Sequence, residues 1–451
     1  MRYAVSFSWL FSCANVAFVA DYRRMLEGPS NFSGRWIAVV MAVVAATWLC
    51  YAGIRHGLAG HYGASLNPDD WSRASHIEPG DAENWYRLGR YRQLDFDHAD
   101  TPLAISFYRR AVQLNPRSAF YKLDLASALE MSGNNAEAEK YYRGAQQNYP
   151  ISAEVSWRYG NFLLRQQRLP EAYAEIQRAV EVDPKMLPLA VSRAWHSNPD
   201  VHLLLDQVLP NTAEADWAAL SFLTDTQDAT AAFAVWNHLI ALKPNIDKDK
   251  TSALIALLVA QEHYDEAGSV WHQSMDPTWT ASAESNRGSR VFDGGFEKDL
   301  STGGFGWRQE NVPGADFAFD TVEKHSGARS ASLSFDGTQN LDYGNFHQDV
   351  LVTPGTRYRF RGYLRTDKIT TESGMRFEIL DPKDINNLDV LTPNETGTQP
   401  WTLEETDFTT GPKTHLIRIR LRRAPSGRLD NRLSGTVWVD DVELFPVASI
   451  R

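Results

Sequence analysis

A 34-residue period in the first half of the chain limits its fold more than any other feature. Pro116, Pro150 and Pro184 are each 34 residues apart and end similar segments. Small residues recur at fixed distances before each proline, with one larger residue between them: Ala104, Tyr108 and Ala111; Ala138, Tyr142 and Ala145; Ala172, Ile176 and Ala179. Small residues at helical spacing let two helices pack closely, and a proline ends the second helix. The period therefore predicts stacked helical hairpins.

The first helix of each pair carries a second pattern. Trp85-x-x-Leu88-Gly89 has the order W-x-x-L-G, and Tyr159-Gly160 stands at the same place in the third unit. On these residues the segment resembles the tetratricopeptide repeat family, whose hairpins form a scaffold that holds protein partners. The first unit departs from the family by three extra residues at 95–100, where we expect a longer loop.

Less regular helical pairs follow the three aligned units. They cover residues 186–210, 212–244 and 251–277, and the first of them is broken at Asn198-Pro199. We therefore expect about six helical hairpins in an α-solenoid that occupies residues 81–280.

A charge-free run of nineteen residues, Trp36 to Ile54, precedes the repeats. As a helix it would span roughly the 30 Å of a bilayer's hydrocarbon core. Aromatic residues at both ends, Trp36, Trp48 and Tyr51, are typical of the membrane–water interface. We predict a membrane anchor at 1–60 with a transmembrane helix at 36–54; the alternative is a buried core helix. Residues 61–80 are polar, contain turn formers and are expected to be a linker.

A weaker apolar run lies at residues 4–20. This run has several possible interpretations. It is a signal-like or lipoprotein-like segment, a second membrane span, or sequence upstream of a translation start at Met25. Arg23, Arg24 and Arg35 make the stretch before the main span basic, and basic flanks stay cytoplasmic. Everything after Ile54 is then expected on the outer side, with one span or with two.

From about residue 281 the pattern changes to period-two alternation separated by Pro/Gly turns. Segments such as 330–335, 358–363, 417–422 and 436–444 read as strands. Eight or nine short strands over residues 288–451 predict an antiparallel β-sandwich.

This C-terminal region resembles the jelly-roll carbohydrate-binding modules. The resemblance rests on an opening Gly294-Gly295-Phe296-Glu297, on Trp307, on Ser326-Gly327 before a strand and on a closing Trp438–Val442 segment. It implies a glycan-binding scaffold, although jelly rolls also serve as structural or protein-binding modules.

Composition excludes some functions. A net charge of −11 and a pI near 5.6 argue against a nucleic-acid partner, which needs a basic face. Both cysteines, Cys13 and Cys50, precede the folded domains, so no thiol nucleophile is available there. No nucleophile-elbow, zinc-protease, P-loop or dinucleotide motif stands where a strand meets a helix. We expect a non-catalytic protein that needs no organic cofactor.

Three groups of residues are candidates for binding. The first helices line the concave surface in the resembled family, and its register places there Tyr86, Arg90, Ser127, Trp157 and Asn161. The alternative is ordinary solvated or interhelical packing. In the resembled modules the opening and closing segments supply oxygens to a structural calcium, which implies Glu297 and Asp441 as ligands here. The alternative for these carboxylates is turn capping.

The third group is aromatic. Sugars stack their apolar faces on exposed rings, and the candidates are Trp307, Tyr343, Phe346 and Trp401. The alternative is that these rings form the sandwich core. Two stripes of arginines by period two, 357–361 and 418–422, include Arg359 as a candidate contact to acidic sugars.

The leading hypothesis is a membrane-anchored, non-catalytic scaffold of the bacterial cell envelope, whose repeats hold a protein and whose sandwich contacts a polysaccharide during its assembly or export. A purely structural factor whose sandwich binds protein is the second hypothesis, and a polysaccharide-processing enzyme is the third.

Overall fold

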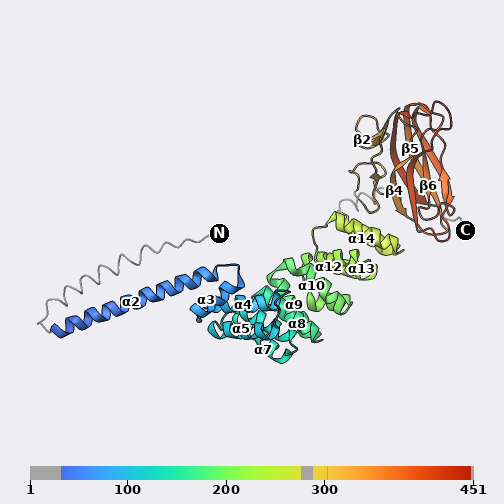
Figure 1. Ribbon diagram of the computed structural model, residues 1–451. Helices are drawn as coiled ribbons and strands as arrows, with labels where there is room; N and C mark the ends of the chain where they lie inside the picture. Colours follow the sequence, from blue (N-terminus) through green and yellow to red (C-terminus); the bar gives the residue numbers. More distant parts are fainter. Residues whose placement is uncertain (1–31, 276–287, 302, 448–451) are drawn as a thin grey trace. The chain divides into compact units, whose positions relative to one another are not determined.

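The computed structural model describes residues 32–275, 288–301 and 303–447 (Figure 1). The chain divides into two compact units, one ending at Tyr159 and the other beginning at Gly160, so the boundary falls inside a single helix. Each unit is described by itself below. The apolar run at residues 4–20 and the basic pair before residue 25 lie outside the described residues.

Helix α2, Phe32–Gly63, contains the charge-free run and continues for two more turns. Residues 36–63 form a helix that is long and apolar enough to cross a membrane, and its most apolar 18-residue window has a mean hydropathy of 2.2. The expected linker at 61–80 is wrong, because half of it is helix α3, Pro68–Ile77, and its first three residues still belong to α2. Asn67 accepts a hydrogen bond from the backbone N–H of Asp69 at 3.0 Å, so the presumed turn residues cap a helix.

Three regular hairpins follow. They are α4 Ala82–Leu94 with α5 Thr101–Leu114, α6 Ala119–Met131 with α7 Asn135–Asn148, and α8 Ala153–Arg165 with α9 Leu169–Val182. The small and large residues of the 34-residue period are buried between helices, as the sequence predicts. Gly89 shows why the first helix needs a glycine: a Cβ there would lie 2.6 Å from the ring of Tyr108.

Three further pairs complete the helical region, which confirms the expectation of about six hairpins. They are α10 Leu187–Ser197 with α11 Val201–Leu203, α12 Ala213–Asp225 with α13 Ala229–Ala241, and α14 Lys248–Ala260 with α15 Tyr264–Ser274. Helix α11 continues as one π-helical turn, Leu204–Val208, so the pair broken at Asn198-Pro199 is shorter, as expected.

The C-terminal domain is an antiparallel sandwich of two sheets. One sheet has the order β1 Arg308–Gln309, β4 Tyr343–Leu351, β9 Leu416–Arg423, β6 Arg376–Leu380 and β7 Asp389–Leu391. The other has the order β2 Ala315–Asp320, β3 Ser330–Asp336, β10 Ser434–Pro446, β5 Arg357–Ile369 and β8 Gly397–Thr409.

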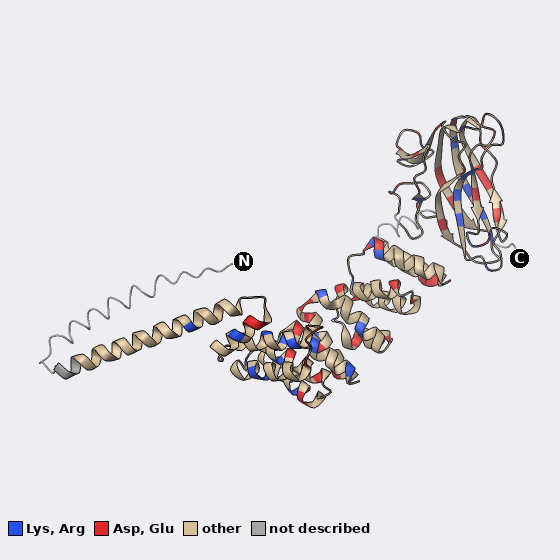
Figure 2. Cartoon of the chain, viewed as in Figure 1, with Lys and Arg blue, Asp and Glu red and all other residues tan. Residues whose placement is uncertain are grey.

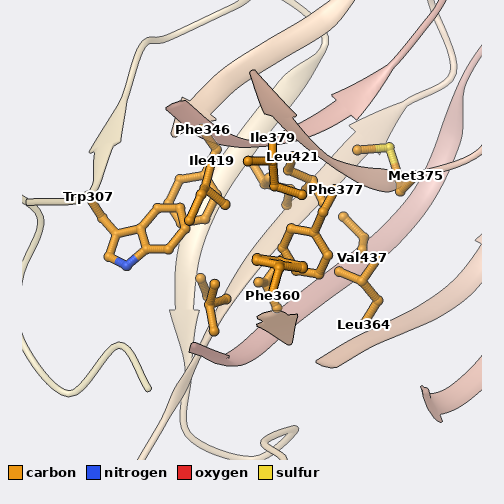
Figure 3. Close-up of a cluster of buried hydrophobic side chains, with 14 of the residues drawn as sticks. Trp307, Phe346, Phe360, Leu364, Met375, Phe377, Ile379, Ile419, Leu421 and Val437 are labelled. Atoms are coloured by element: carbon orange, nitrogen blue, oxygen red, sulfur yellow. The ribbon is translucent and has the colours of Figure 1, made fainter. Parts of the chain in front are cut away.

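The core of this domain lies between the two sheets (Figure 3). Alternate residues of β5 point inward, so Tyr358, Phe360 and Leu364 are fully buried while the arginines between them are not. Facing side chains such as Phe377 and Ile419 come from the other sheet. The period-two pattern therefore assigned the inner and outer faces of these strands correctly.

Within the second unit the last hairpin contacts the sandwich. The ring of Tyr264 stacks on that of His415 with centroids 5.0 Å apart, and Trp271 meets Phe292 edge-on at 5.4 Å. Glu262, between α14 and α15, forms an ion pair of 2.9 Å with Lys383. The sandwich and α15 therefore share a mixed aromatic and charged contact.

Candidate binding surfaces

The residues predicted to face the repeat groove all come from first helices. Tyr86 and Arg90 lie on α4, Ser127 on α6, and Trp157 and Asn161 on α8. Arg90 is exposed and the other four are half-buried, so none of the five belongs to the buried core. Their contact with a partner stays a prediction.

Tyr86 belongs to a polar network that links the first helices of three repeats. Its hydroxyl donates to Oδ2 of Asp124 on α6 at 2.7 Å, and Nη1 of Arg158 on α8 donates to Oδ1 of the same carboxylate at 2.8 Å. The ring of Tyr86 packs against that of Tyr121, with centroids 4.6 Å apart. Burial, together with the bond to Asp124, raises the pKa of Tyr86, so the phenol remains a donor at neutral pH.

Asp124 and Arg158 were not predicted as functional residues, although their spacing and charges could have identified them. They are 34 residues apart, hence at the same repeat position on neighbouring first helices, and carry opposite charges. A second link joins the hydroxyl of Tyr121 to Oε2 of Glu83 at 3.0 Å. The network ties the first helices of neighbouring repeats together, and Arg90, 6.0 Å from the ring of Tyr86, is an exposed cation beside it.

Three of the four predicted sugar-stacking rings are core residues, so this prediction is wrong for them. Trp307 is 3% exposed, and Tyr343 and Phe346 are fully buried. The rings of Trp307 and Phe346 stack 4.9 Å apart between the sheets (Figure 3). A ring enclosed in this way has no face left for a sugar, and the alternative that these rings form the core is correct.

Trp401 differs, because it lies on the outer face of β8 and is half-buried. Its edge meets the ring of His325 at 5.8 Å, and His325 in turn stacks on Tyr363 of β5 at 3.6 Å. Leu403, two residues along β8, is 39% exposed. We call His325, Tyr363, Trp401 and Leu403 the outer-face cluster. Tyr363 could have been found from the sequence, because it continues the outward alternation of the β5 arginines.

Arg359 is exposed on the same face, but its charge is matched. Its Nε and Nη2 donate to both oxygens of Asp407 at 2.8 and 3.2 Å, and Arg357 donates to the same carboxylate. Arg361 pairs with Glu405 at 3.1 Å. Hydrogen bonds from Arg359 and Arg357 lower the pKa of Asp407, so these pairs stay ionised.

The second arginine stripe is matched in the same way. On β9, Arg418 pairs with Asp349 at 2.7 Å, and Arg420 and Arg422 pair with carboxylates of neighbouring segments. Figure 2 shows basic and acidic residues interspersed along the strands of the sandwich. An acidic sugar would have to displace these carboxylates, so the two stripes offer little free positive charge.

Glu297 and Asp441 reach the same loop, residues 325–328. Oε1 of Glu297 accepts from the backbone N–H of Ala328 at 2.7 Å. Oδ1 of Asp441 accepts from the hydroxyl of Ser326 at 2.8 Å, and its Oδ2 pairs with Nδ1 of His325 at 2.6 Å. Beside them, burial raises the pKa of Asp440 to about 6, although its Oδ2 accepts from two backbone N–H groups of the loop.

This arrangement fits turn capping directly. Each carboxylate already accepts from a donor of the loop, and in the part of the chain that the structure describes no group of three or more His, Cys, Asp or Glu side chains could hold a metal ion. A calcium here would need neutral oxygens, such as the Ser326 hydroxyl and backbone carbonyls, besides Glu297 and Asp441. The calcium site stays a prediction.

A chelator tests it. If calcium bridges Glu297 and Asp441, EDTA at neutral pH should lower the melting temperature, because a ligand that binds only the folded state stabilises it. Asp441→Ala should abolish that sensitivity, whereas Asp299→Ala, at an exposed carboxylate of the same segment, should leave it intact. Equal melting temperatures with and without chelator would leave turn capping as the role of both residues.

Comparison with known proteins agrees with the helical geometry. A family model described as tetratricopeptide repeat matches residues 93–151 and 123–186. The helices within residues 93–186 match the tetratricopeptide repeat. The repeats are protein-interaction modules and are typically non-catalytic. No curated protein sequence matches the chain.

Several solved structures are similar to part of the chain. The tetratricopeptide repeat protein YrrB, titled as having an unusual peptide-binding site, is 14% identical, with 49% of this chain and all of that chain covered and a TM-score of 0.26. A family 4 carbohydrate-binding module is 15% identical, covering 35% and 99%, with a TM-score of 0.26. The xylan-binding domain of Xyn10C from Paenibacillus barcinonensis is 14% identical, covering 34% and 92%, with a TM-score of 0.25.

Proposed function

We propose that the protein is a membrane-anchored, non-catalytic scaffold of the bacterial cell envelope. Its tetratricopeptide repeats hold a protein partner, and its sandwich contacts a polysaccharide during surface assembly or export. Helix α2 supplies the anchor, and the basic residues before it favour delivery of the repeats and the sandwich to the outer side.

The outer-face cluster is the observation that carries the glycan part. Trp401 and Tyr363 present partly exposed rings from adjacent strands, and Leu403 adds an exposed apolar side chain beside them. Rings on a sheet face suit the flat apolar side of a sugar. Because Arg359 and Arg361 are already paired, stacking rather than charge would supply the affinity, and we favour a neutral polymer.

Affinity electrophoresis tests this site. A soluble fragment that begins at Arg55 should be retarded by one or more neutral envelope polysaccharides, with a Kd in the micromolar to millimolar range, roughly −4 to −8 kcal/mol. Trp401→Ala should weaken retardation at least about tenfold, since loss of one stacking ring costs on the order of 1.4 kcal/mol or more. Arg359→Ala should change it little.

Control variants distinguish glycan binding by the sandwich from the protein-binding alternative. Trp85→Ala, at a half-buried tryptophan of the repeats, should leave retardation unchanged. Retardation by no polymer, or retardation that survives Trp401→Ala, would favour the protein-binding alternative. Stronger loss with Arg359→Ala than with Trp401→Ala would point to an acidic polymer.

A purely structural role is the second candidate, and the stacking of Tyr264 on His415 favours it, because the sandwich uses part of its surface to contact the last hairpin. An enzyme would need two carboxylates across an accessible cleft. Glu404 and Glu395 do lie close together, with the pKa of Glu404 raised, but Glu404 is only 2% exposed and a polymer cannot reach it.

A further inference from the structure

Helix α2 passes the end of the charge-free run without a break. The run ends at Ile54, and the helix continues to Gly63. At 1.5 Å per residue, the additional nine residues carry the helix about 13 Å beyond the apolar span. A flexible joint would need a break in the helix at this point, and the structure shows none.

The first polar residues after the run hold the next helix in place. Nε of Arg55 donates to the carbonyl oxygen of Ile77, the last residue of α3, at 2.6 Å. Nδ1 of His56 pairs with Glu78 at 3.0 Å. A cation at a helix C-terminus satisfies carbonyls that have no partner within the helix and complements the helix dipole. These contacts join the boundary of the apolar span to the end of α3.

Further contacts extend this packing to the first repeat. Ala59 of α2 is 1% exposed and Ala74 of α3 is fully buried, so the two helices pack through small residues as the repeats do. The carbonyl of Gly63 accepts from Arg87 of α4, and a Cβ at Gly63 would lie 2.8 Å from Oδ1 of Asn84. The last turns of α2 therefore serve as the capping helix of the solenoid, and α2, α3 and α4 form one packed body.

We propose that α2 holds the repeat groove at a fixed height and rotation relative to the bilayer, and that the partner of this groove is a segment of an integral membrane protein. The proposal rests on the proposed membrane anchoring. A partner that diffuses in solution can reach the groove in any orientation, so rigid mounting gives no advantage. A partner embedded in the same bilayer has a fixed orientation too, and a matched mounting removes most of the rotational entropy cost of binding.

Rigid mounting is measurable in the full chain. With Cys13 and Cys50 replaced by serine, spin labels at Val40→Cys in α2 and Phe120→Cys in α6, both exposed positions, report one distance by double electron–electron resonance. In vesicles of phosphatidylethanolamine and phosphatidylglycerol we expect a single narrow distribution. A Gly-Ser-Gly-Gly insertion between Ile54 and Arg55 should widen it at least about twofold, because glycine-rich segments are flexible.

A native distribution as broad as that of the insertion variant would overturn the rigid mounting. Flotation of the vesicles tests anchoring separately: a chain that does not float disproves the membrane role, while the spin-label distance in detergent still reports the mounting. Failure of membrane anchoring and failure of rigid mounting are therefore distinguishable.

Helical insertions test the partner. Two alanines between Ile54 and Arg55 rotate the repeats by about 200° and raise them about 3 Å, whereas four rotate them by a net 40° and raise them about 6 Å. A photocrosslinking residue at exposed Arg90, which is predicted to face the groove, should trap the partner in native membranes. We expect two alanines to reduce the product about tenfold and four to reduce it less than about threefold. Equal yields with both insertions, or a trapped partner whose uncrosslinked form carbonate extracts from the membrane, would overturn an integral membrane partner.

Discussion

Gly89→Ala is expected to destabilise the first repeat by about 1–3 kcal/mol, toward the upper end of the range for overpacking. The new methyl group would lie 2.6 and 2.7 Å from two carbons of the Tyr108 ring. Tyr108 is fully buried, and its hydroxyl donates to Gln93 at 2.7 Å, so the ring cannot move aside without losing that bond. Thermal unfolding of the fragment that begins at Arg55, followed by circular dichroism, measures the loss.

Gly60→Ala is the matched control. Gly60 is also helical, in α2, but a Cβ there would meet no atom within 4 Å. Alanine should therefore keep or raise stability by up to about 1 kcal/mol, because glycine is the poorer helix former. If Gly89→Ala also proves neutral, close packing of Tyr108 on α4 is not what holds this hairpin.

The same packing explains why the helical half of the fold could be predicted. On a solvent-exposed surface nothing would require a small residue at the same position every 34 residues. The repeated small residues therefore indicate positions where two helices pack closely. Ala104 and Ala111 are fully buried, as this argument requires. The linker was predicted wrongly because Asn67-Pro68 favours a turn and a helix start equally: Asn is a good N-cap, and Pro suits the first helical turn.

The ring predictions failed for a different physical reason. Tyr343 and Phe346 are three residues apart, and in a regular strand they would face opposite sides. The pairing of β4 with β9 shifts register between them, and this irregularity turns both rings inward. Sequence alternation cannot locate such a shift, which depends on the partner strand. Trp401 keeps the outward phase of Leu403 and Glu405 on β8, so the alternation places it correctly.

Glu404→Gln is expected to remove a pH dependence of the sandwich and to stabilise it at pH 8 by roughly 1–3 kcal/mol. Glu404 is 2% exposed, and its Oε2 has no hydrogen-bond partner. Burial, with the nearby carboxylate of Glu395, raises its pKa to about 7. Glutamine keeps the shape and can donate to Glu395, but it carries no charge to bury.

The direction of the effect follows from the pKa in the two states. The folded pKa of Glu404, about 7, lies above the ordinary value of 4.5, so the folded state binds this proton more tightly than the unfolded state. Stability from this group therefore rises as pH falls from 8 toward 4.5, and it is lost as pH rises through 7. In the glutamine variant this contribution should be absent at every pH.

The difference in stability between the native protein and Glu404→Gln, followed from pH 8 to pH 6.5, isolates Glu404. Buried His347 acts in the opposite direction as pH falls toward 6.5 and below, because burial lowers its pKa to about 4 and the unfolded state then gains protons first. His347 is present in both proteins, so it cancels in the difference, and the native protein should gain on the order of 1 kcal/mol relative to Glu404→Gln over this range. Glu405→Gln, on the outward face beside Arg361, should behave like the native protein, since exposed ion pairs contribute little. A native curve that runs parallel to that of Glu404→Gln over this range would mean that Glu404 is ionised in the fold.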